Sequence, residues 1–313
     1  MSEATAFAVS LVLLLVAAVI VPWLAMRALV PTLEASGRGR VENFRGRPVV
    51  VGLGLVWIIW TLALLTVSFI DSLYASLLSA EGMPIFGEFA IDGMPFLLVL
   101  GAFALGMADD VFGSAADKGF RGHLSALLHG RLTTGALKLF GIGLLAAVSM
   151  APDFGAADVP LWVVVGEWVL QVLAIALTAN LLNLTDLRPG RALKFYSLLS
   201  LAGCILIGVS SSWTIVPFIA LICFGPVVAI WGFDLHERGM LGDAGANAAG
   251  VLVGWVLANA LIAWWWALAA YVVFALALNM ASEKVSFSGV IDRTPPLRWF
   301  DRLGRQKENS HPI

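Results

Sequence analysis

Two adjacent aspartates end an apolar run in the stretch FALGMADDVFGS, residues 103–114. A helix that enters this run at Pro95 rises about 21 Å before it reaches Asp109, at 1.5 Å per residue, so Asp109 and Asp110 are expected near the edge of the acyl region. Carboxylates at that depth are costly unless they meet a cation, a base or a water-filled cleft. The pair therefore predicts a functional site; the alternative is two helix-end acids solvated at the interface.

A second stretch, NLLNLTDLRPGRALK, spaces polar side chains three residues apart on one expected helix face: Asn180, Asn183 and Asp186. Their oxygens can hold a hydrated cation or a sugar hydroxyl, and Arg188 follows directly. Carboxylate, amide and guanidinium groups together suit a phosphate brought in by a metal ion. Asparagines in membrane helices also join neighbouring helices, and that role is expected for Asn259 and Asn279.

The third stretch, GFDLHERGMLGDAGANAAG, places Asp243 among glycines at the expected start of a helix. Glycine lets the backbone approach a ligand closely, and a helix N-terminus favours an anion. A simple N-cap role for Asp243 is the alternative interpretation, with the glycines packing the helix that follows.

The composition of the 313-residue chain, 60% hydrophobic and 13% charged, excludes an ordinary soluble domain. A bilayer core needs roughly 20 apolar residues per helix. Reading for such runs gives nine expected spans, at 7–26, 49–70, 95–114, 135–151, 161–178, 193–210, 215–233, 244–260 and 261–281. The sequence thus predicts an all-α polytopic integral membrane protein, with a transmembrane domain at 1–281 and a tail at 282–313.

Basic residues indicate the orientation of these spans. Lys and Arg follow the first, third, fifth and seventh runs and fill the tail, whereas the stretches 71–94 and 152–160 carry acids and no bases. Short loops rich in Lys and Arg stay in the cytoplasm. We therefore expect a cytoplasmic-membrane protein with its N-terminus outside, its C-terminus inside and all three polar stretches on the cytoplasmic face.

Taken in order and on one face, DDVFG, NLLNLTD and GDAG resemble the cytoplasmic signature of the polyprenyl-phosphate N-acetylhexosamine-1-phosphate transferase superfamily. That superfamily includes phospho-N-acetylmuramoyl-pentapeptide transferase and the GlcNAc-1-phosphate transferases that start teichoic acid and O-antigen assembly. The stretch FRGRPVVVGLG, residues 44–54, is similar to the first loop of the family.

The resemblance implies a Mg²⁺-dependent (or Mn²⁺-dependent) transfer of sugar-1-phosphate from a nucleotide diphosphate sugar to a polyprenyl phosphate lipid. It implies that Asp243 ligates the metal. It also implies that Asp109 and Asp110 orient the metal or the lipid phosphate, and Asp109 is a second candidate metal ligand. Asn183 and Asp186 would contact the donor. By position or charge, further candidates for substrate contacts are Asn180, Lys118, Arg121, Lys138, Arg188 and Arg298. No nucleic acid is expected as a partner, and a homodimer is left open.

Two departures from the pentapeptide transferases shape the expected donor. Pro189 stands where that family has a second acid that helps to read uracil, and the last loop offers Arg298 and no histidine cluster. We therefore expect a donor held more through its phosphates than through its base. Two other classes stay open: a catalytically silent lipid-binding or assembly scaffold, and a transporter. A transporter would favour polar residues at mid-membrane rather than at one interface.

Overall fold

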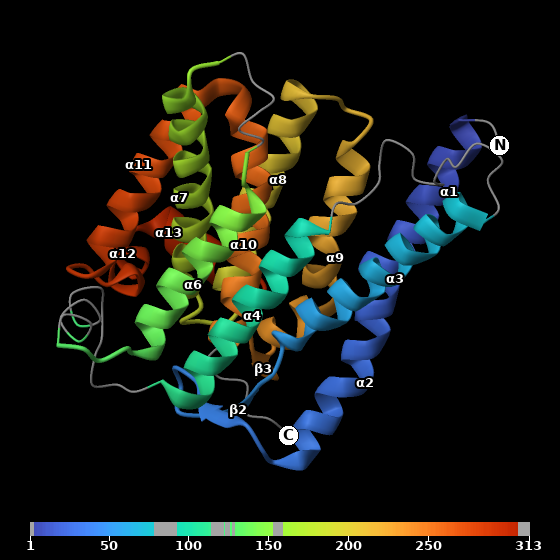
Figure 1. The fold of residues 1–313 in the computed structure, drawn as a ribbon. Coiled ribbons are helices and arrows are strands. Elements are labelled where there is room, and N and C mark those ends of the chain that lie inside the picture. Colours follow the sequence, from blue (N-terminus) through green and yellow to red (C-terminus); the bar gives the residue numbers. More distant parts are fainter. Residues whose placement is uncertain are drawn as a thin grey trace.

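A computed structural model describes residues 3–77, 93–113, 122, 126, 129–152 and 159–305. Helices form most of it, with a small sheet at one end (Figure 1). The helices are α1 (Glu3–Leu15), η1 (Val16–Ile20), α2 (Val21–Ser36), α3 (Leu55–Leu77), α4 (Met94–Phe112), α6 (Thr134–Ser149), α7 (Leu161–Thr185), α8 (Arg191–Ser210), α9 (Val216–Leu235), α10 (Gly242–Leu261), η3 (Ile262–Trp264), α11 (Trp265–Ser282), α12 (Phe287–Arg293) and α13 (Pro295–Arg302). The strands are β1 (Arg40–Glu42), β2 (Pro48–Val51) and β3 (Gly239–Met240).

Within the described residues, seven helical stretches are long and apolar enough to cross a membrane, which confirms a polytopic membrane protein. Each of the nine expected runs overlaps a helix, although the run expected at 49–70 starts in β2 and its helix, α3, begins only at Leu55. Three other runs differ from an independent span. The run at 135–151 is α6, which has only 16 residues. The last two runs lie in one 41-residue stretch, Gly242–Ser282, which is broken at η3 where Trp264 leaves helical geometry at φ −130°.

The first helical stretch continues beyond its expected end. It runs over Ala4–Ser36, whereas the apolar run predicted an end at residue 26. Hydropathy falls at Arg27, but α2 continues to Ser36 and ends at Gly37, whose φ of 67° terminates the helix. Hydropathy marks where a helix leaves apolar surroundings, not where its hydrogen bonds stop.

Helix α10 forms the centre of the bundle, and nearly all of its residues are buried. Small residues let neighbouring backbones approach it closely, as membrane helices commonly do. A Cβ added to Gly106 on α4 would lie 2.5 Å from the carbonyl oxygen of Asp243, and one added to Gly250 would collide with the backbone of Ala179 on α7. This packing brings the start of α10 against the end of α4.

A three-stranded sheet in the order β1-β2-β3 was not part of the all-α prediction. Strand β2 pairs antiparallel with β1 and parallel with β3, with Val50 opposite Arg40 and Gly239. Strands of two to four residues are too short to show an alternating pattern. The sheet ties the loop after α2 to the loop between α9 and α10.

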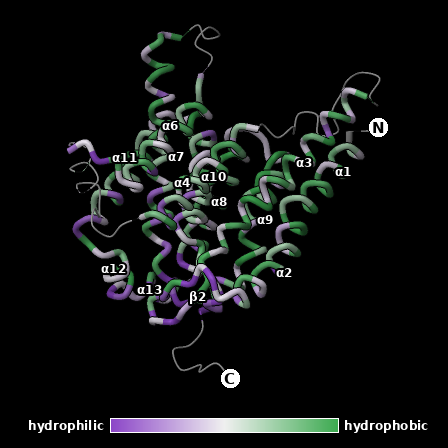
Figure 2. Tube along the Cα trace, turned by 60° about the horizontal axis from the view of Figure 1, so that its bottom comes forward, coloured by the Kyte–Doolittle hydropathy of each residue, from purple (hydrophilic) through white to green (hydrophobic). Residues whose placement is uncertain are grey.

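Hydrophilic residues gather at the end of the bundle that carries this sheet, α12 and α13, which we call the polar end (Figure 2). The helices α4, α7 and α9 end there, and α8 and α10 begin there. All three polar stretches of the sequence therefore meet at one end of the bundle.

Candidate functional site at the polar end

A lysine lies between two of the aspartates. Lys138 Nζ, from the start of α6, is 2.7 Å from Asp109 Oδ2 at the end of α4 and 2.5 Å from Asp243 Oδ2 at the start of α10. The three side chains are 11%, 17% and 32% exposed, respectively. Charge-assisted bonds this short, mostly out of water, hold the three helix ends in register.

Asn183 completes this cluster from α7. In the amide orientation that satisfies both neighbours, its nitrogen donates to Asp243 Oδ1 at 2.8 Å and its oxygen accepts from Lys138 Nζ at 3.2 Å. Three oxygens, from Asp109, Asp243 and Asn183, therefore converge on one positive charge. We call these four side chains the Lys138 cluster.

Asp110 has a different role from its neighbour. Its two carboxylate oxygens accept the backbone N–H groups of Asp243 at 2.9 Å and Ala244 at 3.0 Å. A carboxylate at a helix N-terminus satisfies orphan amides and favours the helix dipole. The N-cap interpretation of Asp243 is therefore wrong: Asp110 supplies the cap, which leaves the Asp243 side chain free to bind Lys138.

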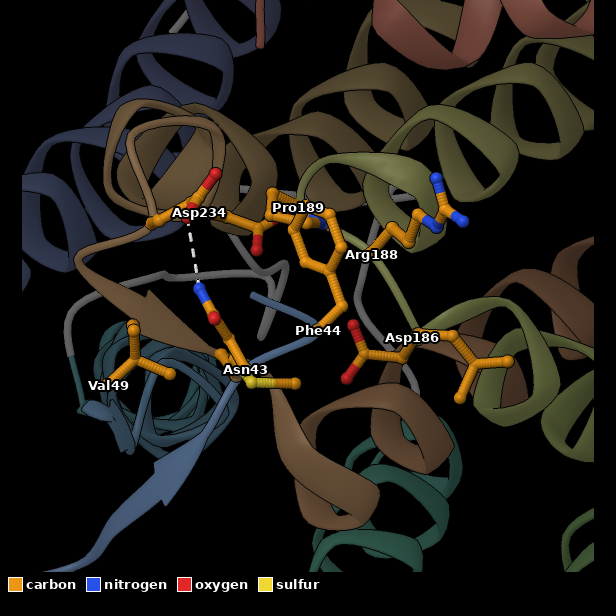
Figure 3. A pocket seen from close by; sticks show the side chains of 11 residues that line it. Asn43, Phe44, Val49, Asp186, Arg188, Pro189 and Asp234 are labelled. Atoms are coloured by element: carbon orange, nitrogen blue, oxygen red, sulfur yellow. Dashed lines mark hydrogen bonds between the residues drawn. The ribbon is translucent and has the colours of Figure 1, made fainter. Parts of the chain in front are cut away.

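Asp186 lies at the end of α7 beside a cavity of about 10 Å³. Residues from the loop after α2, from the 186–189 turn and from the end of α9 line it, including Asn43, Phe44, Asp186, Arg188 and Asp234 (Figure 3). Burial, together with the charges of Asp234, Asp243 and Asp110, raises the pKa of Asp186 well above its usual value, against the opposing effect of the Gly242 amide.

Three arginines surround Phe44, which lines the same cavity. The guanidinium carbons of Arg45, Arg188 and Arg305 lie 5.1, 5.3 and 5.1 Å from the centre of the Phe44 ring. Each has an acidic partner: Glu237 at 3.3 Å for Arg45, Asp292 at 3.0 Å for Arg188 and Asp301 at 2.8 Å for Arg305. We call these three arginines and Phe44 the arginine cluster.

The segment that follows α11 docks onto this region. Asp301 on α13 binds Arg191 Nε at 2.7 Å and Arg305 Nη1 at 2.8 Å, and Lys194 donates to the carbonyl of Asp301 at 2.7 Å. Burial opposes ionisation of Asp301, but the hydrogen bond from Arg191 and the nearby cations hold its pKa below the usual value. Residues 283–305, within the predicted tail, are thus anchored to the start of α8.

Other predicted site residues lie elsewhere. Asn180 donates to Asn279 Oδ1 at 2.6 Å between α7 and α11, which confirms the helix-joining role of Asn279. Arg298 is exposed on α13 and is no part of the Lys138 cluster. Lys118 and Arg121 lie outside the described residues.

Sequence reasoning missed Phe44, Arg45 and Arg305 as parts of one cluster. The signal available for the first two was an aromatic residue beside basic residues in the stretch FRGR. For Arg305 there was none, because its contacts depend on the docking of α13.

The residues present fit a divalent cation by chemistry. Carboxylate and amide oxygens are the ligands that Mg²⁺ prefers, and three of them converge on Lys138 Nζ. Within the described residues, however, no group of three or more His, Cys, Asp and Glu side chains is spaced to hold a metal ion. A metal at these oxygens therefore requires the Lys138 ammonium to move aside.

Comparison of the sequence with protein-family models and with curated proteins found no match.

Proposed function

We propose that this protein is a divergent polyprenyl-phosphate sugar-1-phosphate transferase, which uses Mg²⁺ or Mn²⁺ and starts a cell-envelope glycan at the cytoplasmic face of the cell membrane. The observation that carries the proposal is the Lys138 cluster, in which three oxygens from α4, α7 and α10 converge on a cation at the polar end of a membrane bundle. The order of the motifs in the sequence supports the same reaction class.

The reaction forms a bond between a phosphate oxygen of the lipid and the β-phosphorus of the donor, and it releases a nucleoside monophosphate. A lipid monoester with a second pKa near 6 is mostly dianionic at pH 7, so no general base is required. The bound metal ion would neutralise charge between the reacting phosphates. Asp109, Asp243 and Asn183 would hold it, while Asp110 fixes the start of α10.

The arginine cluster suits the donor. A nucleotide diphosphate sugar carries its charge on the diphosphate, and guanidinium groups bind phosphate oxygens in a fixed fork geometry. Arg188 lies between Phe44 and Asp292 with 27% of its side chain exposed, so it is accessible to a ligand. In the absence of a second acid at position 189, this arrangement favours recognition of the phosphates.

The test is turnover by the purified full-length protein. With polyprenyl phosphate, Mg²⁺ and a panel of UDP-, CDP- and GDP-sugars, we expect nucleoside monophosphate release that requires both the lipid and the metal. Reactions without lipid and reactions in EDTA are the controls. No release from any donor would contradict the transferase proposal.

One observation favours a second function, a catalytically silent scaffold for lipid binding or assembly. Lys138 already neutralises the two carboxylates, as a structural ion pair would. Titration with Mn²⁺, followed by electron paramagnetic resonance, separates the two functions. A transferase binds Mn²⁺ at its site and a scaffold shows neither Mn²⁺ binding nor turnover.

A further inference from the structure

A groove of about 580 Å³ lies between α2 and α9, away from the Lys138 cluster. In both views α2 stands at the side of the bundle opposite α11 (Figure 1, Figure 2). The two helices run in the same direction, and just before α2 begins, the backbone of Ala18 on η1 closely approaches Gly225 on α9. Beyond that contact, toward the polar end, the groove is lined by Trp23, Arg27, Val228, Phe233, His236 and Arg238.

The groove changes from apolar to basic along its length. Trp23 and Val228, 36% and 53% exposed, line the part nearer the middle of the bundle, whereas His236 and Arg238 follow the end of α9. The stretch Ala4–Ser36 has 33 residues, about 50 Å of helix, whereas a bilayer core needs roughly 20 residues. Trp23 and Arg27 therefore lie near one membrane boundary, where Trp marks the interface and Arg meets headgroups.

Charge in the groove is incompletely balanced. Arg238 is held by both carboxylate oxygens of Glu34, at 2.9 and 2.6 Å. Arg27 instead stacks on the Trp23 ring, 4.7 Å from its centre, and within the described part of the chain no carboxylate pairs with it. The groove thus presents a cation without an acidic partner at headgroup depth, next to an exposed apolar wall.

We propose that the α2–α9 groove binds an anionic phospholipid, with the lipid phosphate at Arg27 and an acyl chain over Val228. A free phosphate ion would use only the basic end and would leave the apolar wall uncovered. A zwitterionic lipid would fill the wall but would bring its own cation close to Arg27. The proposal does not depend on the transferase function, because no residue of the Lys138 cluster takes part.

Native mass spectrometry of the purified full chain in detergent tests the proposal. We expect phosphatidylglycerol to be retained about fivefold more tightly than phosphatidylcholine with the same acyl chains, the preference that one interfacial arginine confers. Arg27→Gln should abolish this preference. Arg38→Gln is the matched control, because Arg38 is exposed just beyond the same helix and outside the groove. Val228→Trp, which places a bulky side chain on the apolar wall, should weaken the retention of both lipids.

Three results would overturn the proposal. Equal retention of the two lipids by the unmodified protein would remove the role of charge. An equal effect of Arg27→Gln and Arg38→Gln would show general surface attraction. Displacement of phosphatidylglycerol by millimolar inorganic phosphate, together with unchanged lipid retention by the Val228→Trp variant, would show that the site binds free phosphate. The lipid comparison and the phosphate competition use the unmodified protein, so they decide the question even if Arg27→Gln fails to fold.

Discussion

Lys138→Met removes the ammonium group between Asp109 and Asp243 and keeps most of the side-chain volume. Removing one partner of a buried ion pair costs about 3–5 kcal/mol. Because the Asp243 side chain is 32% exposed, water screens part of the repulsion that remains between Asp109 and Asp243. The free energy of unfolding should therefore fall by about 3 kcal/mol, near the lower end of that range. With an unfolding entropy of about 2.1 cal/mol/K per residue, this corresponds to a fall in the unfolding temperature of roughly 5 °C for the 313-residue chain.

Divalent cations should reverse this loss. In Lys138→Met the oxygens of Asp109, Asp243 and Asn183 face one another with no ammonium between them, so a cation can take its place. Mg²⁺ at a hundredfold excess over its dissociation constant would stabilise the variant by about 2.7 kcal/mol. Tryptophan fluorescence of the protein in detergent, heated in EDTA and in Mg²⁺, measures both effects.

The matched control is Lys138→Met combined with Asp243→Asn, which removes one carboxylate. This double variant should unfold at a higher temperature than Lys138→Met in EDTA and should respond little to Mg²⁺. An equal response to Mg²⁺ in the wild type, the single variant and the double variant would refute the assignment of these oxygens as a cation site.

Three further outcomes are expected. Asp243→Asn should lower transferase turnover by about 100-fold while the protein still elutes as a single species, because asparagine cannot supply the charge that holds Mg²⁺; near-normal turnover would exclude Asp243 as a ligand. Arg188→Gln should raise the KM for the donor about tenfold with every nucleotide tested, whereas exposed Arg298→Gln should change it little, and a loss confined to UDP-sugars would show base reading instead. The lowered pKa of Asp301 stabilises the docked segment above the usual carboxyl pKa of about 3.9, and that stability should disappear as pH falls through the lower folded value. Limited pepsin digestion across that range should therefore release residues from α13 only at the most acidic pH, and Asp301→Asn should release them at higher pH as well.

The sequence was sufficient to predict that the three polar stretches lie on one face of the membrane. Each lies at an end of a long apolar run, and helices that alternate in direction return every second end to the same side of the bundle. Topology therefore places Asp109, Asn183 and Asp243 on the same side of the bundle, whereas their contacts depend on the packing of α4, α7 and α10. The same argument predicted the polytopic membrane class, which the helix lengths confirm.

The position of Lys138 at the centre of the cluster was beyond sequence reasoning. It contacts Asp243 across 105 residues of chain, and an ion pair of that separation leaves no periodic signal. The strands and the docking of α13 were hidden for a related reason: strands of two to four residues are too short for a pattern, and the contact of Asp301 with Arg191 depends on tertiary packing alone.

The charges of the polar end constrain how phosphates could bind there. Two carboxylates and one ammonium give the Lys138 cluster a net charge of −1, since Asn183 is neutral. The adjacent Asp110 carboxylate, which accepts the amides of α10, adds a further negative charge beside it. A buried cluster of that sign repels a phosphate and attracts another cation.

The arginine cluster has its own acidic partners, but its guanidinium groups lie close enough together that burial and mutual repulsion lower the pKa of Arg305. A donor diphosphate is therefore expected to dock at the arginine cluster without metal, whereas a lipid phosphate should bind near Lys138 only together with a divalent cation. Equilibrium binding of a polyprenyl phosphate in Mg²⁺ and in EDTA measures this difference, and equal affinity in the two conditions would place the lipid phosphate elsewhere.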